Sequence, residues 1–163
     1  MDLQKALQEA IKGEIEGREL YSAAAEKTAD GKAKEVFRML ADEEQKHHDA
    51  LVQMAKDYGQ GKDLTMPQFE APARFEDAES PIFTREFKEK VSDFDMSALS
   101  IGIKLELESE KFYRQMAKEA QEKEVKGLFF RLADWEKGHF EYLQKQISFL
   151  EGYYTQKYSM FRF

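Results

Sequence analysis

The stretch LADEEQKH at residues 40–47 returns, 92 residues later, as LADWEKGH at residues 132–139. Both copies contain a glutamate followed three residues later by a histidine. The same offset aligns further identical pairs without a gap: Ala6 with Ala98, Leu7 with Leu99, Ile11 with Ile103, Glu14 with Glu106, Tyr21 with Tyr113 and Phe37 with Phe129. The chain is therefore built from two copies of one structural unit.

Each copy is predicted to be a helical hairpin. In the first copy, apolar residues recur at helical spacing on both sides of a polar break at residues 29–31. In the second copy, the helical runs cover about 97–120 and 123–150, and Ser97 is the expected N-cap. Because a short loop joins the two helices of each copy, the helices must run antiparallel.

The expected architecture is an all-α four-helix bundle made of two repeated antiparallel hairpins joined by a long crossover. A weaker helical signal lies at 81–91. The aromatic C-terminal tail is expected to fold over the bundle or into a contact with a second copy, because an exposed apolar patch of that size would be a liability. The predicted parts of the single domain, 1–163, are hairpin 1 at about 3–58, the crossover linker at about 59–96, hairpin 2 at about 97–150 and the tail at 151–163.

Composition excludes several kinds of site and partner. The 163 residues include 25 basic and 32 acidic side chains, a net charge of −7, which gives no reason to expect nucleic acid or an anionic membrane surface as a partner. Without cysteine, the chain has no disulfide, cysteine-ligated zinc, iron–sulfur cluster or thiol nucleophile. It has no run of about 18 apolar residues to span a membrane. The first residues lack the apolar run of a signal peptide, so we expect a cytoplasmic protein.

The two E-x-x-H pairs, Glu44 with His47 and Glu136 with His139, have a spacing that suits a metal site. Three residues turn a helix by about 300° and advance it by about 4.5 Å, so each pair shares one helix face. Two of the chain's three histidines fall in this pattern, at equivalent points of the repeat. A carboxylate and an imidazole so placed can hold one metal ion, or one ion and a bridge to a second.

The lengths of the helices place two more glutamates at the same level. With a rise of about 1.5 Å per residue from a loop near residue 30, Glu14 lies roughly 24 Å from the turn, and Glu44 and His47 lie roughly 21 and 25 Å from it. The second hairpin, with its loop near residue 122, gives the same distances. Six side chains can therefore meet at one level of the bundle: Glu14, Glu44, His47, Glu106, Glu136 and His139.

The surroundings of these glutamates favour an inward position. Residues at helical spacing from Glu14 and Glu44 on the same face are mostly apolar, for example Ile11 and Leu40. Four buried carboxylates would repel one another and take up protons, whereas two divalent cations would cancel four negative charges, with two neutral histidines completing the site. The alternative is that the glutamates and histidines are ordinary solvated residues of charged helices.

Other residues near these positions are expected to have different roles. His48 is expected at the edge of the core, and Trp135 is expected to pack between helices. Tyr21 and Tyr113 lie on the ligand face, either as half-buried core residues or as hydrogen-bond donors to a terminal glutamate of the opposite half. Residues two positions from a predicted ligand lie about 200° round the helix and should point away: Lys12, Glu16, Asp42, Lys104, Glu108 and Asp134.

The two hairpins resemble the ferritin-like di-iron carboxylate family, and most closely its rubrerythrin-related members. The likeness rests on Gly13-Glu14 with Tyr21 seven residues later, and on the motif L-A-D-x-E-x-x-H at 40–47. It implies a ferritin-like fold that holds two iron ions per chain, with zinc or manganese as substitutes, and a homodimer. The implied roles are bridging ligands for Glu44 and Glu136, terminal ligands for Glu14 and Glu106, and one nitrogen ligand each for His47 and His139.

Two features depart from rubrerythrins proper. Ser109 stands three residues after Glu106, where those proteins carry an extra carboxylate, and no cysteine is present for a rubredoxin module. Electrons would therefore come from an external donor. The expected function is a di-iron oxidoreductase that reacts with hydrogen peroxide or dioxygen, as a peroxidase, oxidase or ferroxidase. The alternatives are a non-catalytic protein that binds zinc, manganese or iron in a structural or regulatory role, and a purely structural four-helix protein.

Overall fold

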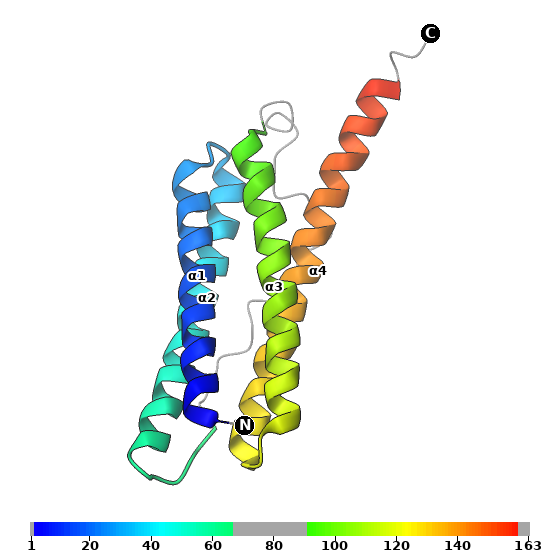
Figure 1. Ribbon diagram of the computed structural model, residues 1–163. Helices are drawn as coiled ribbons and strands as arrows, with labels where there is room; N and C mark the ends of the chain where they lie inside the picture. Colours follow the sequence, from blue (N-terminus) through cyan, green and yellow to red (C-terminus); the bar gives the residue numbers. More distant parts are fainter. Residues whose placement is uncertain (1, 67–90, 160–163) are drawn as a thin grey trace.

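Four long helices make up the fold in the computed structural model, which describes residues 2–66 and 91–159 (Figure 1). The helices are α1 (Leu3–Lys27), α2 (Gly31–Gly59), α3 (Asp93–Glu119) and α4 (Lys123–Ser159). Helix α1 packs along α2, helix α3 packs along α4, and the two hairpins meet mainly between α1 and α3. The predicted all-α bundle of two hairpins is confirmed.

Aspartates fix the starts of the first two helices. The side chain of Asp2 accepts a hydrogen bond from the backbone N–H of Lys5 at 3.2 Å, and that of Asp30 accepts one from Ala33 at 2.9 Å. Each cap satisfies an amide that has no partner within its own helix and contributes about 1 kcal/mol. Because residues 28–30 alone separate α1 from α2, the polar break expected from the sequence makes a tight turn.

Helix α3 begins earlier than the sequence suggested, and Ser97 is not its N-cap. The cap is Ser92, whose hydroxyl accepts from the N–H of Asp95 at 3.1 Å while the Asp95 carboxylate accepts from the N–H of Ser92 at 3.0 Å. This reciprocal pair is a capping box. Ser97 lies inside the helix and donates to the carbonyl of Asp93 at 2.7 Å. Apolar spacing marks which face is buried, whereas the first turn is set by these polar contacts.

Helix α4 also runs further than expected, to Ser159, and projects beyond the ends of the other helices (Figure 1). Over residues 151–159 the expectation of a tail folded over the bundle is therefore wrong. Gly152 lowers helix stability by only about 1 kcal/mol, and Tyr154 stacks on Tyr158 one turn later, with ring centroids 6.4 Å apart. Tyr158 is 66% exposed. Residues 160–163, and the 81–90 part of the weak helical signal, lie outside the described residues.

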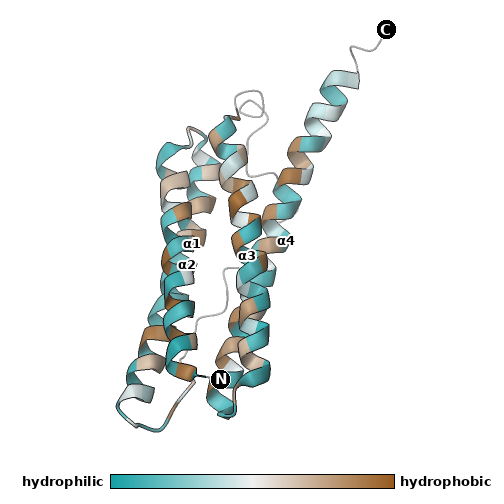
Figure 2. Cartoon of the chain, in the orientation of Figure 1, coloured by the Kyte–Doolittle hydropathy of each residue, from teal (hydrophilic) through white to brown (hydrophobic). Residues whose placement is uncertain are grey.

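The core is divided into two apolar clusters along the bundle axis. One surrounds Leu7, Met54 and Phe129, and the other surrounds Phe37 and Leu143. Figure 2 shows hydrophobic and hydrophilic residues alternating along each helix, the pattern of a helix with one buried face. Between the two clusters, every helix places charged side chains in the interior, so a polar layer crosses the middle of the bundle. No described helix is both long enough and apolar enough to cross a membrane.

Candidate metal centre

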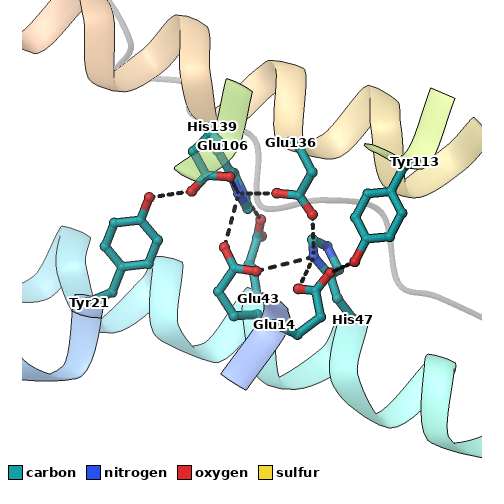
Figure 3. Close-up of polar contacts among 9 residues, drawn as sticks. Glu14, Tyr21, Glu43, His47, Glu106, Tyr113, Glu136 and His139 are labelled. Atoms are coloured by element: carbon teal, nitrogen blue, oxygen red, sulfur yellow. Dashed lines mark hydrogen bonds and ion pairs between the residues drawn. The ribbon is translucent and has the colours of Figure 1, made fainter. Parts of the chain in front are cut away.

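All six residues predicted as metal ligands meet in this polar layer, and each is only 1–3% exposed. Figure 3 labels five of them, which point toward one another: Glu14, His47, Glu106, Glu136 and His139. Helices α1 and α3 each supply one glutamate, and helices α2 and α4 each supply a glutamate and a histidine one turn apart. The apolar clusters on both sides keep the layer from water. The structure therefore brings together every residue of the predicted set: Glu14, Glu44, His47, Glu106, Glu136 and His139.

The six side chains form two overlapping groups of four. The first group is Glu14, Glu44, His47 and Glu136, and the second is Glu44, Glu106, Glu136 and His139. Within each group, one ligand atom from every residue lies within 4.8 Å of the others. The groups share Glu44 and Glu136, so they lie side by side, and the two imidazole rings are stacked with centroids 5.8 Å apart.

The two shared carboxylates each turn one oxygen toward each group. Glu44 places Oε2 3.5 Å from Nδ1 of His47 and Oε1 3.4 Å from Nδ1 of His139. Glu136 places Oε1 3.2 Å from Nδ1 of His47 and Oε2 3.4 Å from Nδ1 of His139. This is the arrangement that a pair of bridging carboxylates requires.

Each of the other two glutamates belongs to one group. Oε2 of Glu14 lies 3.3 Å from Nδ1 of His47, and Oε2 of Glu106 lies 3.5 Å from Nδ1 of His139. Ligands bound tetrahedrally at about 2.1 Å from one ion are separated by about 3.4 Å. The spacing between these donor atoms is therefore that of the first coordination shell of a small cation.

Several of the oxygen and nitrogen atoms that would bind a metal ion make no hydrogen bond within the described part of the chain, although they are buried. They are Oε2 of Glu14, Nδ1 of His47 and both carboxylate oxygens of Glu136. Burying such groups without a partner is costly, and a bound cation is a partner that satisfies several of them at once. The residues present therefore fit a pair of metal ions.

The charges of the layer perturb the pKa values of its members. Burial, followed by the charges of Glu136 and Glu44, raises the pKa of Glu14 well above its ordinary value. Burial and the charge of Glu44 do the same for Glu106. Burial alone would lower the pKa of His47, but the carboxylates of Glu136 and Glu14 outweigh it and raise that pKa. When no cation is bound, these glutamates and the histidine therefore tend to be protonated, and the protons offset part of the negative charge of the layer.

Two tyrosines cross between the hairpins to reach the terminal glutamates. Tyr21 of α1 donates a hydrogen bond to Oε1 of Glu106 in α3, and Tyr113 of α3 donates one to Oε1 of Glu14 in α1 (Figure 3). The tyrosines were expected either as half-buried core residues or as hydrogen-bond donors to the opposite half, and the structure shows the hydrogen bonds. Because Oε1 is held by a phenol, Oε2 of each glutamate is left facing its histidine.

The residues expected to point away do so. Glu16 and Glu108 lie on the outside of the bundle, in exposed ion pairs with Lys12 and Lys104. Asp42 and Asp134 are also exposed, and Asp134 accepts from Arg114 at 3.1 Å. His48 is partly exposed and lies 3.0 Å from Asp49. None of these side chains enters the polar layer.

Sequence reasoning missed Glu43, which is 4% exposed. Its Oε2 lies 2.8 Å from Nε2 of His139, the nitrogen that faces away from the two groups. Trp135, expected between helices, stacks on the ring of His47 with centroids 4.8 Å apart. The burial of Glu43, though not its partner, could have been predicted. Glu43 lies about 100° round the helix from Glu44, and its equivalent in the repeat is Trp135, which was expected to pack between helices.

Gly17→Ala is expected to weaken metal binding by about tenfold without unfolding the protein. A Cβ at residue 17 would lie 3.3 Å from Cδ and 3.4 Å from Cγ of Glu44, so the shared carboxylate would have to move. The matched control is Gly13→Ala on the same helix, where a Cβ meets nothing within 4 Å. Both variants should gain helix stability, and calorimetric titration should separate them. Equal metal affinities of the two variants would show that a Cβ at residue 17 does not displace the Glu44 carboxylate.

Comparison with known proteins supports the same fold and site. A family model described as Rubrerythrin matches residues 5–147, which include all six residues of the two groups. A solved structure titled as a hypothetical protein from Pyrococcus furiosus is similar in fold, with a TM-score of 0.69 and 28% sequence identity. The similarity covers 94% of this chain and 92% of that one. No curated protein matches the chain significantly.

Proposed function

Because the chain belongs to the rubrerythrin family, we propose that it is a di-iron oxidoreductase that reacts with hydrogen peroxide or dioxygen and takes electrons from a separate donor. One observation carries the proposal: the two groups share both Glu44 and Glu136, so these residues would hold two ions at neighbouring positions. When bound there, two ferrous ions would supply the two electrons that reduce the oxidant and would become ferric.

The ligand set supports iron. Each group offers three carboxylates and one imidazole, and hard oxygen ligands stabilise ferric iron. The same residue types also bind zinc and manganese, which is the basis of the alternative function, a non-catalytic metal-binding protein. Reactivity with peroxide separates the two functions, because bound iron or manganese can turn over with peroxide, whereas zinc has no redox chemistry.

The chain's own residues orient the ligands, exclude water and hold protons. The apolar clusters above and below the layer keep solvent away, which strengthens every charge interaction inside it. Burial, together with the charge of Glu106, raises the pKa of Tyr21, and burial with the charge of Glu14 raises that of Tyr113. Both phenols therefore stay protonated and remain hydrogen-bond donors to the terminal carboxylates.

The proposal is tested by anaerobic titration of the metal-free protein with Fe(II), followed by rapid mixing with hydrogen peroxide or dioxygen. We expect two irons to bind per chain and ferric absorption to appear quickly after mixing. The faster oxidant identifies peroxidase-like or oxidase-like chemistry. Tight binding of two ions without oxidation would favour the non-catalytic alternative, and failure to bind two ions would contradict the site itself.

Tyr21→Phe is expected to slow ferrous oxidation and to weaken binding of the ion next to Glu106 by about 10–100-fold. The change removes the hydroxyl that holds Oε1 of Glu106 but keeps the ring stacked on Phe37. Tyr58→Phe, at a residue that is 40% exposed, is the control. Rapid-mixing absorbance and an iron-binding isotherm measure the two effects. An unchanged rate would mean that the phenol only packs in the core.

A further inference from the structure

The two halves of the metal centre differ at one pair of equivalent positions beside the histidines. Glu43 of α2 and Trp135 of α4 are 92 residues apart and occupy the same place in the repeat. Each contacts the histidine of the other hairpin. Glu43 lies 2.8 Å from Nε2 of His139, whereas Trp135 stacks on His47 at an interplanar angle of 16°. One imidazole is thus held by a carboxylate and the other by an aromatic face.

We propose that Glu43 makes the two metal positions unequal, so that the position completed by His139 binds a divalent cation more tightly and fills first. The inference rests on the proposed function only in taking both groups as metal positions. Glu43 is thus a positioning residue, which would act on the metal through His139.

The geometry at His139 suits this role. Its Nδ1 faces the carboxylates of Glu44, Glu106 and Glu136 at 3.4–3.5 Å, so Nε2 is the nitrogen left to carry the proton. A carboxylate that accepts from Nε2–H fixes the tautomer in which Nδ1 has a free lone pair, holds the ring in place and strengthens Nδ1 as a donor. Glu43 is buried, where such a contact is stronger than in water.

The environment of His47 differs in this respect. In residues 2–66 and 91–159, every carboxylate paired with His47 lies on Nδ1, at 3.2–3.5 Å. The indole of Trp135 keeps the ring in position by packing, but an indole N–H is only a donor and cannot accept a hydrogen bond from Nε2–H. Glu43 therefore gives His139 an anionic hydrogen-bond acceptor, and Trp135 gives His47 none.

The other ligands are matched between the halves, which isolates the difference. Glu14 corresponds to Glu106, and each is held by a tyrosine from the opposite hairpin. Glu44 and Glu136 serve both groups equally. Gly17 and Ser109 also differ, but they lie on α1 and α3 and stay unchanged in the test below.

The test is a titration of the metal-free chain with Zn(II), followed through the side-chain nitrogen resonances of the histidines by NMR. In the unmodified chain, the signals of His139 should change over the first equivalent of Zn(II) and those of His47 over the second. In Glu43→Gln, which keeps a neutral acceptor at the same place, the affinity of the first step should fall by about 10–100-fold and the order should be lost. Trp135→Phe keeps an aromatic ring on His47, and the order should survive.

Three results would decide against the inference. If both histidines respond together in the unmodified chain while two ions bind, the positions are equal, although the proposed function stands. If Glu43→Gln leaves the first step unchanged, another residue sets the order. If fewer than two ions bind, the proposed function fails first, and this inference fails with it. Thermal unfolding of the metal-free variants, expected to change little, shows that the effect is on the metal position and not on folding.

Discussion

Glu136→Ala is expected to abolish metal binding at both positions, whereas Glu14→Ala should abolish it at one. The reason is that Glu136 turns one oxygen toward each group and Glu14 belongs only to the group of His47. Loss of the shared ligand should lower both affinities by more than about 100-fold, beyond the effect of residues that only hydrogen-bond to ligands. Metal content after dialysis against Fe(II) or Zn(II) measures the difference.

The same variant should make the metal-free protein less stable. The pKa of Glu136 is lowered and its charge raises the pKa of His47, so removing it leaves a buried imidazolium without that partner. Glu16→Ala, on the exposed face of α1, is the control and should change neither metal content nor melting temperature. A Glu136→Ala protein that still binds two ions per chain would contradict the bridging role. A more stable metal-free variant would show that repulsion among the carboxylates outweighs the pairing of Glu136 with the histidines.

The metal-free protein is expected to lose stability as pH rises above about 6.5, the ordinary pKa of histidine, and the zinc-loaded protein is expected to gain it. In the metal-free state, the pKa values of Glu14, Glu106, His47 and His139 are raised above their unfolded values. The folded chain therefore binds more protons than the unfolded chain, and the free energy of unfolding falls as pH rises through these values. Zinc competes with the same protons, so its stabilising effect grows with pH.

Melting temperatures at several pH values, measured with a chelator and with excess Zn(II), test this expectation. The pKa values of Glu44 and Glu136 are lowered, which acts in the opposite sense, but only below about pH 4.5. Glu106→Gln replaces one titrating carboxylate by a neutral amide and should make the metal-free slope shallower, whereas Glu108→Gln on the exposed face should not. A melting temperature of the metal-free protein that rises with pH over this range would refute the expectation.

The repeat explains why so much of the fold and the candidate site could be predicted from the sequence. Helical spacing fixes which residues share a face, and a short loop fixes the level at which two antiparallel faces meet. These two rules bring Glu14, Glu44 and His47 together without reference to the other hairpin. The duplication then supplies the remaining ligands, because the second hairpin aligns with the first without a gap and keeps the same residue at all three ligand positions.

What the sequence did not predict depends on contacts between elements or on helix ends. The partner of Glu43 is on another hairpin, and nothing near Glu43 in the chain indicates which residue it meets. The start of α3 is set by polar contacts between Ser92 and Asp95, outside the apolar pattern. Helix α4 continues through the aromatic segment to Ser159, because that segment contains no proline to end the helix.

The sharing of ligands between hairpins has a consequence for the origin and assembly of the molecule. Neither hairpin contains a complete metal position, since the group of His47 needs Glu136 and the group of His139 needs Glu44. Two identical hairpins related by a two-fold axis would exchange ligands in the same way, which is an isologous association. Joining the hairpins in one polypeptide turns that association into an intramolecular step with a high effective concentration. It also allows the sequence of one hairpin to change without the other. The equivalent positions Glu43 in the first hairpin and Trp135 in the second are an example.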